Sequence, residues 1–424
     1  MQKHYDQRET ADPQERERSL MERLPKALRQ ATLRAPAIAT QLQGVEPDAL
    51  RSRADLARIP VIRKSELLQA QLEAREKAKH AGKIRAEDVF AGFSTIGWGQ
   101  AKRVFASPGP MYEPESARPD YWGFARALYA AGIRDNELVY NCFSYHFTPA
   151  GSMMETAAHA LGCTVFPGGV GQTEQQVVAM QDLAPTAYTG TPSFLKIILE
   201  KAQAMGTRIP SLSKALFSGE AFTPSMQAWF VEHGVNGFQA YGSADLGMIA
   251  YETEAREGLV LNEDMIVEIV RPGTGIVVPD GEVGEVVITT LNPDYPLVRF
   301  GTGDLSAVMP GASACGRTNT RIRGWLGRAD QTTKIRGMFV HPAQVAQILA
   351  RHPEFSRARL VVRGKLGEDK MVLQLEGAEQ FSSLEESVLS SVREITKLRA
   401  ELEFVTVGTL PNDGKVIEDQ RSYE

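Results

Sequence analysis

A carboxylate and a glycine turn near residue 304 offer the most specific chemistry in this sequence. Asp304 directly follows the turn Gly301-Thr302-Gly303, and the turn follows a strand-like run from Pro296 to Phe300. A carboxylate in this position can accept hydrogen bonds from two neighbouring hydroxyl groups, as the diol of a ribose requires. We therefore predict that Asp304 contacts a ribose, with a turn-capping aspartate as the alternative.

Charged residues recur towards the C-terminus. Arg328 and Asp330 stand close together after a glycine, and a basic turn, Lys334-Ile335-Arg336-Gly337, comes soon after them. Lys415 ends the run Leu-Pro-Asn-Asp-Gly-Lys. A lysine on a loop is a compact, mobile cation that can bridge a carboxylate and a phosphate. Surface turns and solvated lysines are the alternatives for these positions.

Two further segments place small and polar residues where predicted strands end. The first is Ser218-Gly219-Glu220, and the second is Ala240-Tyr241-Gly242-Ser243, with Asp245 two residues beyond it. Tyr241 offers a ring on which a flat base can stack, and Gly242 permits a tight turn. Asp245 is a hard oxygen ligand suited to Mg²⁺. A strand-end turn and a helix-starting aspartate are the alternatives.

Together these motifs resemble the adenylate-forming ligases, and most closely their phenylacetate–CoA ligase branch. The resemblance runs from about Asp55 to Arg421. It implies an α/β fold: a large adenylation domain (residues 1–327) with mostly parallel sheets and a small β unit, and a small, mobile α+β domain (residues 328–424). It also implies that ATP and Mg²⁺ activate an aromatic or arylacetic carboxylic acid through an acyl-adenylate to its coenzyme A thioester. Because an anion attacks a polyanion in the first step, cations and oriented donors must carry the catalysis.

The resemblance assigns a role to each residue of the motifs. Lys415 and Asp245 are the expected catalytic residues, Asp245 also holds Mg²⁺, and Asp330 is the expected hinge. The residues expected to bind ATP, AMP or coenzyme A are Ser94, Thr95, Ser218, Gly219, Glu220, Ala240, Tyr241, Gly242, Ser243, Asp304, Arg328, Lys334, Arg336 and Gly337. Those expected to bind the acid are Tyr145, His146, Phe147, Ala150, Gly168 and Gly169, for which core packing is the alternative.

The chain departs from the family pattern in its phosphate loop. The family sequence S-S-G-T-T-G-K-P aligns here with residues 94–101, Ser-Thr-Ile-Gly-Trp-Gly-Gln-Ala. Gln100 replaces the lysine that would face the phosphates, and Ile96 replaces a glycine. Lys102 and Arg103 follow and are candidate substitutes. In addition, Asp245 is one methylene shorter than the family's glutamate, and the spacer before Lys415 is one residue shorter.

Composition excludes several other classes of protein. The chain has 424 residues, 43% hydrophobic and 23% charged, which is typical of a globular protein with two or more domains. A net charge of −5 argues against a nucleic-acid partner. Three cysteines without a C-x-x-C pair favour a reducing compartment. No apolar run approaches the ~18 residues of a membrane span, so we expect a cytoplasmic protein. Residues 251–264, where many relatives carry a Cys/His cluster, contain neither residue, and we expect no zinc.

The elements that must position these residues alternate along the chain. Strand-like and helical runs between about residues 89 and 290 predict βαβ units, whose ligands lie at the carboxyl ends of parallel strands. The predicted strands are 137–141, 163–166, 187–188, 215–218 and 237–241, and the predicted helices are 150–161, 175–183, 193–204 and 224–233. We predict helices at 50–58 and 65–79, a rigid loop over 104–114, and a hairpin or small barrel from 266–270 and 285–289. In the last domain we predict strands at 360–363, 371–375 and 402–407 and helices at 342–351 and 383–400.

Two other functions remain open from the sequence. One is an adenylating enzyme that passes its acyl group to a carrier protein or an amine. The other is a catalytically weak nucleotide- or acyl-binding protein, which the altered phosphate loop suggests. The expected partner is a small carboxylic acid, and the family resemblance implies a homodimer.

Overall fold

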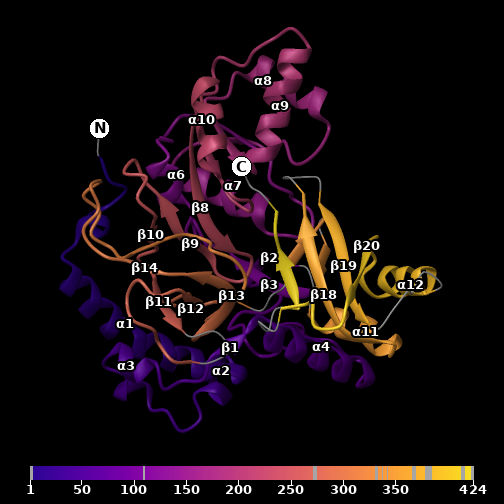
Figure 1. Ribbon diagram of the computed structural model, residues 1–424. Coiled ribbons are helices and arrows are strands. Elements are labelled where there is room, and N and C mark those ends of the chain that lie inside the picture. Colours follow the sequence, from indigo (N-terminus) through magenta and orange to yellow (C-terminus); the bar gives the residue numbers. More distant parts are fainter. Residues whose placement is uncertain are drawn as a thin grey trace. The chain divides into compact units, whose positions relative to one another are not determined.

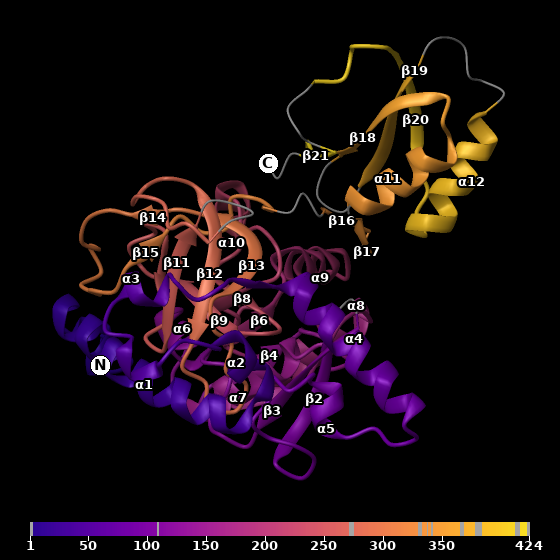
Figure 2. The ribbon, with the colours of Figure 1, turned by 90° about the horizontal axis from the view of Figure 1, so that it is seen from below.

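The chain divides into two units, Met1–Gly327 and Arg328–Glu424, and each is described by itself (Figures 1 and 2). The computed structural model describes residues 3–107, 110–270, 275–329, 333–336, 338–340, 342–364, 369–377, 384–411 and 416–421. Three residues with predicted roles, Asp330, Gly337 and Lys415, lie outside these ranges.

A nine-stranded sheet runs through the first unit in the order β14-β15-β10-β9-β8-β7-β6-β4-β5. Its strands are β4 (Leu138–Asn141), β5 (Thr164–Phe166), β6 (Ala187–Gly190), β7 (Lys214–Phe217), β8 (Asn236–Ser243), β9 (Gly247–Glu252), β10 (Leu259–Leu261), β14 (Val308–Met309) and β15 (Arg321–Ile322). The five strands from β5 to β8 pair in parallel, and the pairs from β8 to β14 are antiparallel. The carboxyl ends of β4, β6, β7 and β8 therefore share one edge, as a βαβ rhythm predicts.

One helix precedes the parallel strands, four connect them, and together they cover the sheet (Figure 1). They are α6 (Ala125–Ala130), α7 (Ala150–Ala160), α8 (Thr173–Leu183), α9 (Pro192–Ala204) and α10 (Pro224–Glu232). The hydroxyls of Thr191 and Thr223 cap the first turns of α9 and α10, each next to a proline that suits the first helical position. The predicted helices and strands of this region are present, with ends that differ by at most two residues.

A second, four-stranded sheet has the order β1-β13-β12-β11. Its strands are β1 (Ile62–Arg63), β11 (Met265–Val270), β12 (Gly284–Thr290) and β13 (Phe300–Ser306). Here β1 pairs in parallel with β13, and Arg63 lies opposite Gly301. This pairing brings residues 62–64 next to Gly301 and to the segment before Asp304. The turn predicted at Gly301-Thr302-Gly303 is wrong, because these three residues lie within β13, where Gly301 pairs with both neighbouring strands.

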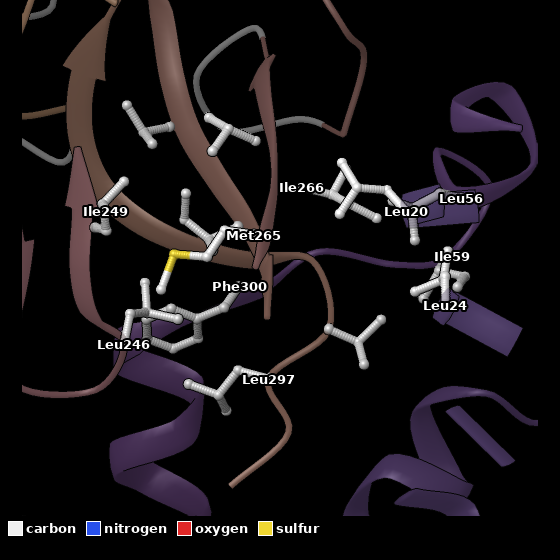
Figure 3. Close-up of a cluster of buried hydrophobic side chains, with 14 of the residues drawn as sticks. Leu20, Leu24, Leu56, Ile59, Leu246, Ile249, Met265, Ile266, Leu297 and Phe300 are labelled. Atoms are coloured by element: carbon white, nitrogen blue, oxygen red, sulfur yellow. The ribbon is translucent and has the colours of Figure 1, made fainter. Parts of the chain in front are cut away.

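The N-terminal helices pack against this second sheet (Figure 3). They are α1 (Pro13–Arg34), α2 (Pro36–Gln41), α3 (Arg53–Leu56), α4 (Lys64–His80) and α5 (Ala86–Val89), with short 3₁₀ turns at Gln7–Thr10 and Pro47–Ala49. Leu20 and Leu24 of α1 share a cluster of buried side chains with Leu56, Ile59 and Ile266. Only four of the residues predicted as a helix at 50–58 are helical, because the side chains of Ser52 and Asp55 hold a short capped turn.

The predicted loop over residues 104–114 is wrong. Strands β2 (Ala101–Ser107) and β3 (Met111–Ser116) form an antiparallel hairpin there, with Phe105 opposite Glu113. Pro114 is accommodated in β3 of this isolated two-stranded ribbon, as prolines are at sheet edges. Of the residues that suggested a loop, Pro114 lies within an edge strand, and Pro108 and Gly109 lie outside the described residues.

The second unit is a small α+β unit with its own core. Its main sheet has the order β20-β19-β18-β21, with β18 (Phe355–Arg363), β19 (Lys370–Gly377), β20 (Glu401–Thr406) and β21 (Ile417–Asp419). Helices α11 (Pro342–Arg351) and α12 (Glu385–Thr396) pack on this sheet (Figure 2). A short hairpin, β16 (Thr333–Ile335) with β17 (Met338–Val340), precedes them and carries Lys334 opposite Phe339.

Candidate active site

The predicted ribose-binding carboxylate lies in a hydrogen-bonded group formed by both sheets of the first unit. Asp304 is on β13, and its Oδ2 accepts a hydrogen bond of 2.8 Å from the hydroxyl of Tyr241 on β8. Its Oδ1 accepts one of 3.1 Å from Nε1 of Trp325, and its backbone N–H donates to Oγ1 of Thr302. Asp304 and Tyr241 are half-buried. A carboxylate has about four acceptor positions, which lets it bond several donors at once.

Asp245 forms a buried ion pair that the sequence did not predict. It lies in the turn between β8 and β9, so the alternative of a helix-starting residue is wrong. Its side chain is 1% exposed, and its Oδ2 is 2.8 Å from the Nζ atom of Lys64, the first residue of α4. Its Oδ1 has no hydrogen-bond partner among the described residues. A buried carboxylate oxygen without a donor can accept a cation or a hydrogen bond.

A second buried carboxylate lies within electrostatic range of this ion pair. Glu113 of β3 is fully buried and accepts a hydrogen bond of 2.7 Å from the hydroxyl of Ser107. Burial and the negative charge of Asp245 raise the pKa of Glu113 well above its usual range, while Lys64 acts in the opposite direction. Its Oε2 is also unpaired within the described part of the chain. Lys64 is therefore a cation that acts on two acidic groups, Asp245 by an ion pair and Glu113 electrostatically.

The altered phosphate loop is held by contacts within the protein. The hydroxyl of Ser94 donates to the carbonyl of Ile96, and that of Thr95 donates to the carbonyl of Pro293 at 2.6 Å. Oε1 of Gln100 accepts a hydrogen bond of 3.1 Å from the backbone N–H of Gly97. Gln100 thus stabilises the turn in which the family has a phosphate-binding lysine.

The candidate substitutes for that lysine differ in their contacts. Arg103 forms an ion pair of 2.7 Å with the buried carboxylate of Glu115 and also donates to the hydroxyl of Ser152. Lys102 is exposed on β2. Lys64 is a third candidate for the role of the missing lysine, because it is ion-paired with Asp245. The parallel pairing of β1 with β13 brings the start of α4 beside the second sheet.

The other predicted nucleotide-binding residues lie at the carboxyl ends of β7 and β8. Ser218 donates to the carbonyl of Ala240 at 2.8 Å, which joins the two segments. Gly219 has a φ of 81°, a conformation that glycine adopts without strain. Glu220 is exposed and accepts from the backbone N–H of Ser193 in the first turn of α9. Gly242 allows close packing, because a Cβ there would lie 2.7 Å from the carbonyl oxygen of Gly247. The buried hydroxyl of Ser243 has no partner among the described residues.

The predicted acid-binding residues lie in two loops that follow β4 and β5. Tyr145 is half-buried, and its hydroxyl accepts a hydrogen bond of 2.8 Å from Asn141. His146 and Phe147 are exposed, and Phe147 has a φ of 61° with an exposed fraction of 81%. Such a conformation is strained for a bulky residue and is found at functional sites. Ala150 begins α7, and Gly168 and Gly169 are half-buried after β5.

The predicted residues of the second unit are only partly described. Arg328 is half-buried and is the first residue of this unit. The backbone N–H of Arg336 donates to the carboxylate of Asp369 at 2.9 Å, and its φ is 47°. Lys334 is paired through its backbone in β16. The predicted roles of Asp330, Gly337 and Lys415 stay predictions.

Sequence reasoning missed Lys64, Glu113 and Trp325. Each contacts or faces a predicted residue from a distant segment, and no local pattern marks any of them. The only available signal was that Lys64 follows the short apolar run 59–62 after Arg63, and that the end of this run, Ile62, begins β1 (Ile62–Arg63). No helix among the described residues has the length and apolar character that crossing a membrane requires.

Comparisons with known proteins identify the family of this chain. A sequence model described as AMP-binding enzyme matches residues 121–292, which include β4 to β8 and Asp245. The phenylacetate-coenzyme A ligase of Thermus thermophilus is 32% identical over 388 residues, covering 87% of this chain and 83% of that protein. The phenylacetate-coenzyme A ligase of Aromatoleum evansii is 31% identical over 374 residues, covering 84% and 80%.

The fold is also that of a solved structure. A 2-hydroxyisobutyryl-CoA ligase, crystallised with an acyl-AMP and CoA, has a TM-score of 0.77 at 23% identity, over 99% of this chain and 93% of that one. At this identity the likeness shows the fold alone, whereas the identity to the two curated relatives, over most of each chain, also shows the family. This chain belongs to the phenylacetate–coenzyme A ligase family of AMP-binding enzymes.

Proposed function

We propose that this enzyme activates an aromatic or arylacetic carboxylic acid, with phenylacetate as the first candidate, to its coenzyme A thioester through an acyl-adenylate. The observation that carries the proposal is the group of Tyr241, Asp304 and Asp245 at the carboxyl end of β8, within a chain that is 32% identical to a phenylacetate-coenzyme A ligase. A carboxylate such as that of Asp304 can accept hydrogen bonds from both hydroxyls of an adenosine ribose.

Mg²⁺ is the metal that the proposed reaction uses, and the residues present fit it. Asp245 keeps one oxygen, Oδ1, without a partner in the described part of the chain. Mg²⁺ in nucleotide sites is bound by one or two carboxylates together with phosphates and water, so one such oxygen is sufficient. When bound, the ion neutralises charge on the phosphates. The ammonium of Lys64, which lies 2.8 Å from Asp245, is a protein cation that would also neutralise charge on the phosphates.

We propose that the second unit serves the two half-reactions in turn. Lys415 would act in adenylation as the cation between the attacking carboxylate and the α-phosphate. The turn of Lys334, Arg336 and Gly337 would meet coenzyme A after a rotation at Asp330, and Arg328 would reach the ribose or phosphates. Support comes from the family to which the chain belongs and from its division after Gly327. A homodimer, the assembly that the family resemblance implies, belongs to the same proposal and is tested by light scattering.

ATP–pyrophosphate exchange with a panel of carboxylic acids tests the proposal. We expect exchange to depend on one class of acid, with phenylacetate and benzoate tested first, and AMP release to rise when coenzyme A is added. The acid that drives exchange identifies the substrate class.

Two outcomes would contradict the proposal. Acid-dependent exchange without any response to coenzyme A would point to another acceptor. Binding of ATP without exchange for any acid would show that the contacts of Ser94, Thr95 and Gln100 leave a loop that does not support adenylation.

A further inference from the structure

Both predicted acid-binding loops are attached to the end of one strand. β4 ends at Tyr140 and Asn141, whose side chains point to opposite faces of the sheet because side chains alternate along a strand. Tyr140 is packed among the buried side chains of α8 and α9, and Asn141 contacts the start of α7. One strand end therefore reaches both loops, residues 145–150 and residues 168–171.

Gln176 connects Tyr140 to the glycine loop. Gln176 lies on α8 and is 4% exposed. Its Nε2 donates to the carbonyl oxygens of Gly168 and Gly171 at 2.9 and 3.2 Å, with that of Gly169 at 3.4 Å. Its Oε1 accepts a hydrogen bond of 2.6 Å from the hydroxyl of Tyr140. The reverse orientation of the amide would set its oxygen against three carbonyl oxygens, so the network fixes the orientation.

Asn141 holds the other loop and is fully buried. Its Nδ2 donates to the hydroxyl of Tyr145 at 2.8 Å and to the carbonyl of Gly151 at 2.9 Å. Its Oδ1 accepts from the backbone N–H of Phe143 and from the hydroxyl of Thr189 on β6. Every hydrogen-bonding group of this amide is therefore used, and such saturated buried networks favour one conformation.

The same strand end also contacts the glycine loop through its backbone. The N–H of Gly169 donates to the carbonyl of Asn141 at 3.0 Å. A Cβ at Gly168 would lie 2.7 Å from Cε1 of Tyr140 and 2.8 Å from Oε1 of Gln176, so the loop packs too closely for any side chain. The position of the loop is thus set by Gln176 and β4.

We propose that Gln176 and Asn141 are positioning residues that hold the two loops around the acid and thereby set which carboxylic acids the enzyme accepts. This inference rests on the proposed function, because the two loops are the acid-binding segments of that proposal. Neither side chain needs to touch the substrate. Each acts through a segment that does, Gln176 through Gly168 and Gly169 and Asn141 through Tyr145.

Gln176→Met tests the inference, because methionine keeps the length of the side chain and removes its hydrogen bonds. This change also leaves the hydroxyl of Tyr140 without its acceptor, so Gln176→Met with Tyr140→Phe is the second variant, in which both partners are removed. Gln175→Met is the matched control: Gln175 is the neighbouring glutamine on α8, it is exposed, and its side chain is not part of this network.

We expect both Gln176 variants to raise the KM for the acid about tenfold, because a change of this size corresponds to the net free energy that the lost hydrogen bonds contribute. The ratio of kcat/KM for phenylacetate to that for benzoate should change in both variants, while their KM for ATP stays at the wild-type value. The control variant should keep the wild-type KM for the acid and the wild-type ratio. A double variant with wild-type KM and wild-type acid preference would overturn the inference. Thr189→Val, which removes one hydrogen bond of Asn141 without changing a predicted acid-binding residue, should shift acid preference in a milder form.

Amide hydrogen exchange gives a readout that does not depend on activity. In Gln176→Met we expect faster exchange in peptides that cover residues 166–172, with peptides over 143–151 unchanged. Unchanged exchange at 166–172 would show that Gln176 does not position the loop. If the wild-type enzyme activates no acid, the proposed function fails, and hydrogen exchange still decides whether these residues position the loops.

Discussion

At the scale of single residues, the site depends on charged and polar groups that pair across segments distant in sequence. Asp304 accepts from Tyr241 and Trp325, and Asp245 pairs with Lys64. These contacts fix the orientation of each carboxylate before any nucleotide binds. Preorganised charges of this kind are the main means by which an enzyme lowers the barrier for attack on a polyanion.

Asp304→Asn should weaken nucleotide binding more than acid binding. The substitution keeps the shape of the side chain but exchanges one acceptor oxygen for a donor that faces Tyr241 or Trp325. We expect the KM for ATP to rise about tenfold or more, since a hydrogen bond to a charged group contributes about 1.5–3 kcal/mol. Pyrophosphate exchange at varied ATP and at varied acid measures the two effects separately. An unchanged KM for ATP would remove Asp304 from the nucleotide site.

Lys64→Met should destabilise the fold as well as the reaction. It leaves the carboxylate of Asp245 buried without its cation, which typically costs 3–5 kcal/mol. Because the side chain of Lys64 is 36% exposed, solvent screening reduces the expected loss to about 1–3 kcal/mol. Urea unfolding measures it. Lys79→Met, on the exposed end of the same helix, is the control, and adding Asp245→Asn should restore part of the stability. A fully stable Lys64→Met protein would contradict this account.

At the scale of elements, a buried arginine joins the strands of the second sheet to the connector before β1. Arg299 is 1% exposed, and its Nε forms an ion pair of 2.9 Å with Glu268 of β11. Its other nitrogens donate to the carbonyls of Ala57, Ile59 and Gly275. Arg299 therefore holds residues 57–59 beside β13, which supports the pairing of β1 with β13 that places Lys64.

Arg299→Met should consequently be among the most destabilising single changes in the chain. Glu268 would remain as an uncompensated buried charge, and three carbonyl oxygens would lose their donor. We expect a loss of about 3–5 kcal/mol in the free energy of unfolding, measured by urea denaturation. Adding Glu268→Gln should recover part of it. A loss below 1 kcal/mol would show that the carbonyls find other partners.

The turn before α6 should make stability depend on pH. Asp120 accepts hydrogen bonds from the backbone N–H of Ala125, but burial raises its pKa to about 7. Since the unfolded value is near 3.8, the folded chain binds more protons between these values, and stability falls as pH rises from about 4 to 7. Measuring the free energy of unfolding of the wild type and of Asp120→Asn between about pH 4 and 7 tests this prediction. The difference between the two proteins should change with pH; a constant difference would contradict the prediction.

At the scale of the whole molecule, the proposed mechanism assigns different half-reactions to different parts of the chain. Lys64 belongs to the first unit, and Lys415 to the second. Both are candidate cations for adenylation, because the phosphate loop has Gln100 in place of its lysine. The two candidates can be separated because thioester formation from an acyl-adenylate does not require the attack on ATP.

Lys415→Ala should abolish most pyrophosphate exchange while a supplied acyl-adenylate is still converted to the thioester. Arg336→Ala should show the opposite pattern, with exchange retained and the thioester step slowed, because Arg336 belongs to the turn expected to meet coenzyme A. Chromatography of the products of each half-reaction measures both. If Lys415→Ala keeps normal exchange, the role of the adenylation cation passes to Lys64.

The sequence determined much of the fold, because its helices and strands follow from local periodicity and from turn residues. The βαβ run between β4 and β8 was confirmed, as was the placement of Ser218 and Tyr241 at strand ends, where parallel strands place ligands. Asp304 was predicted from the glycines before it, although these lie within β13 and not in a turn, and its role stays a prediction. The hairpin of β2 and β3 was missed, because the prolines and the glycine in the sequence of residues 104–114 favour a loop locally.

Only the tertiary structure decided which residues surround these motifs. Lys64 beside Asp245, Trp325 beside Asp304, and Gln176 with Asn141 behind the two acid loops all depend on pairings between segments distant in sequence. A lysine, a tryptophan or a glutamine carries no local pattern that names its partner. Burial and strand register create these contacts, so they exist only once the chain has folded.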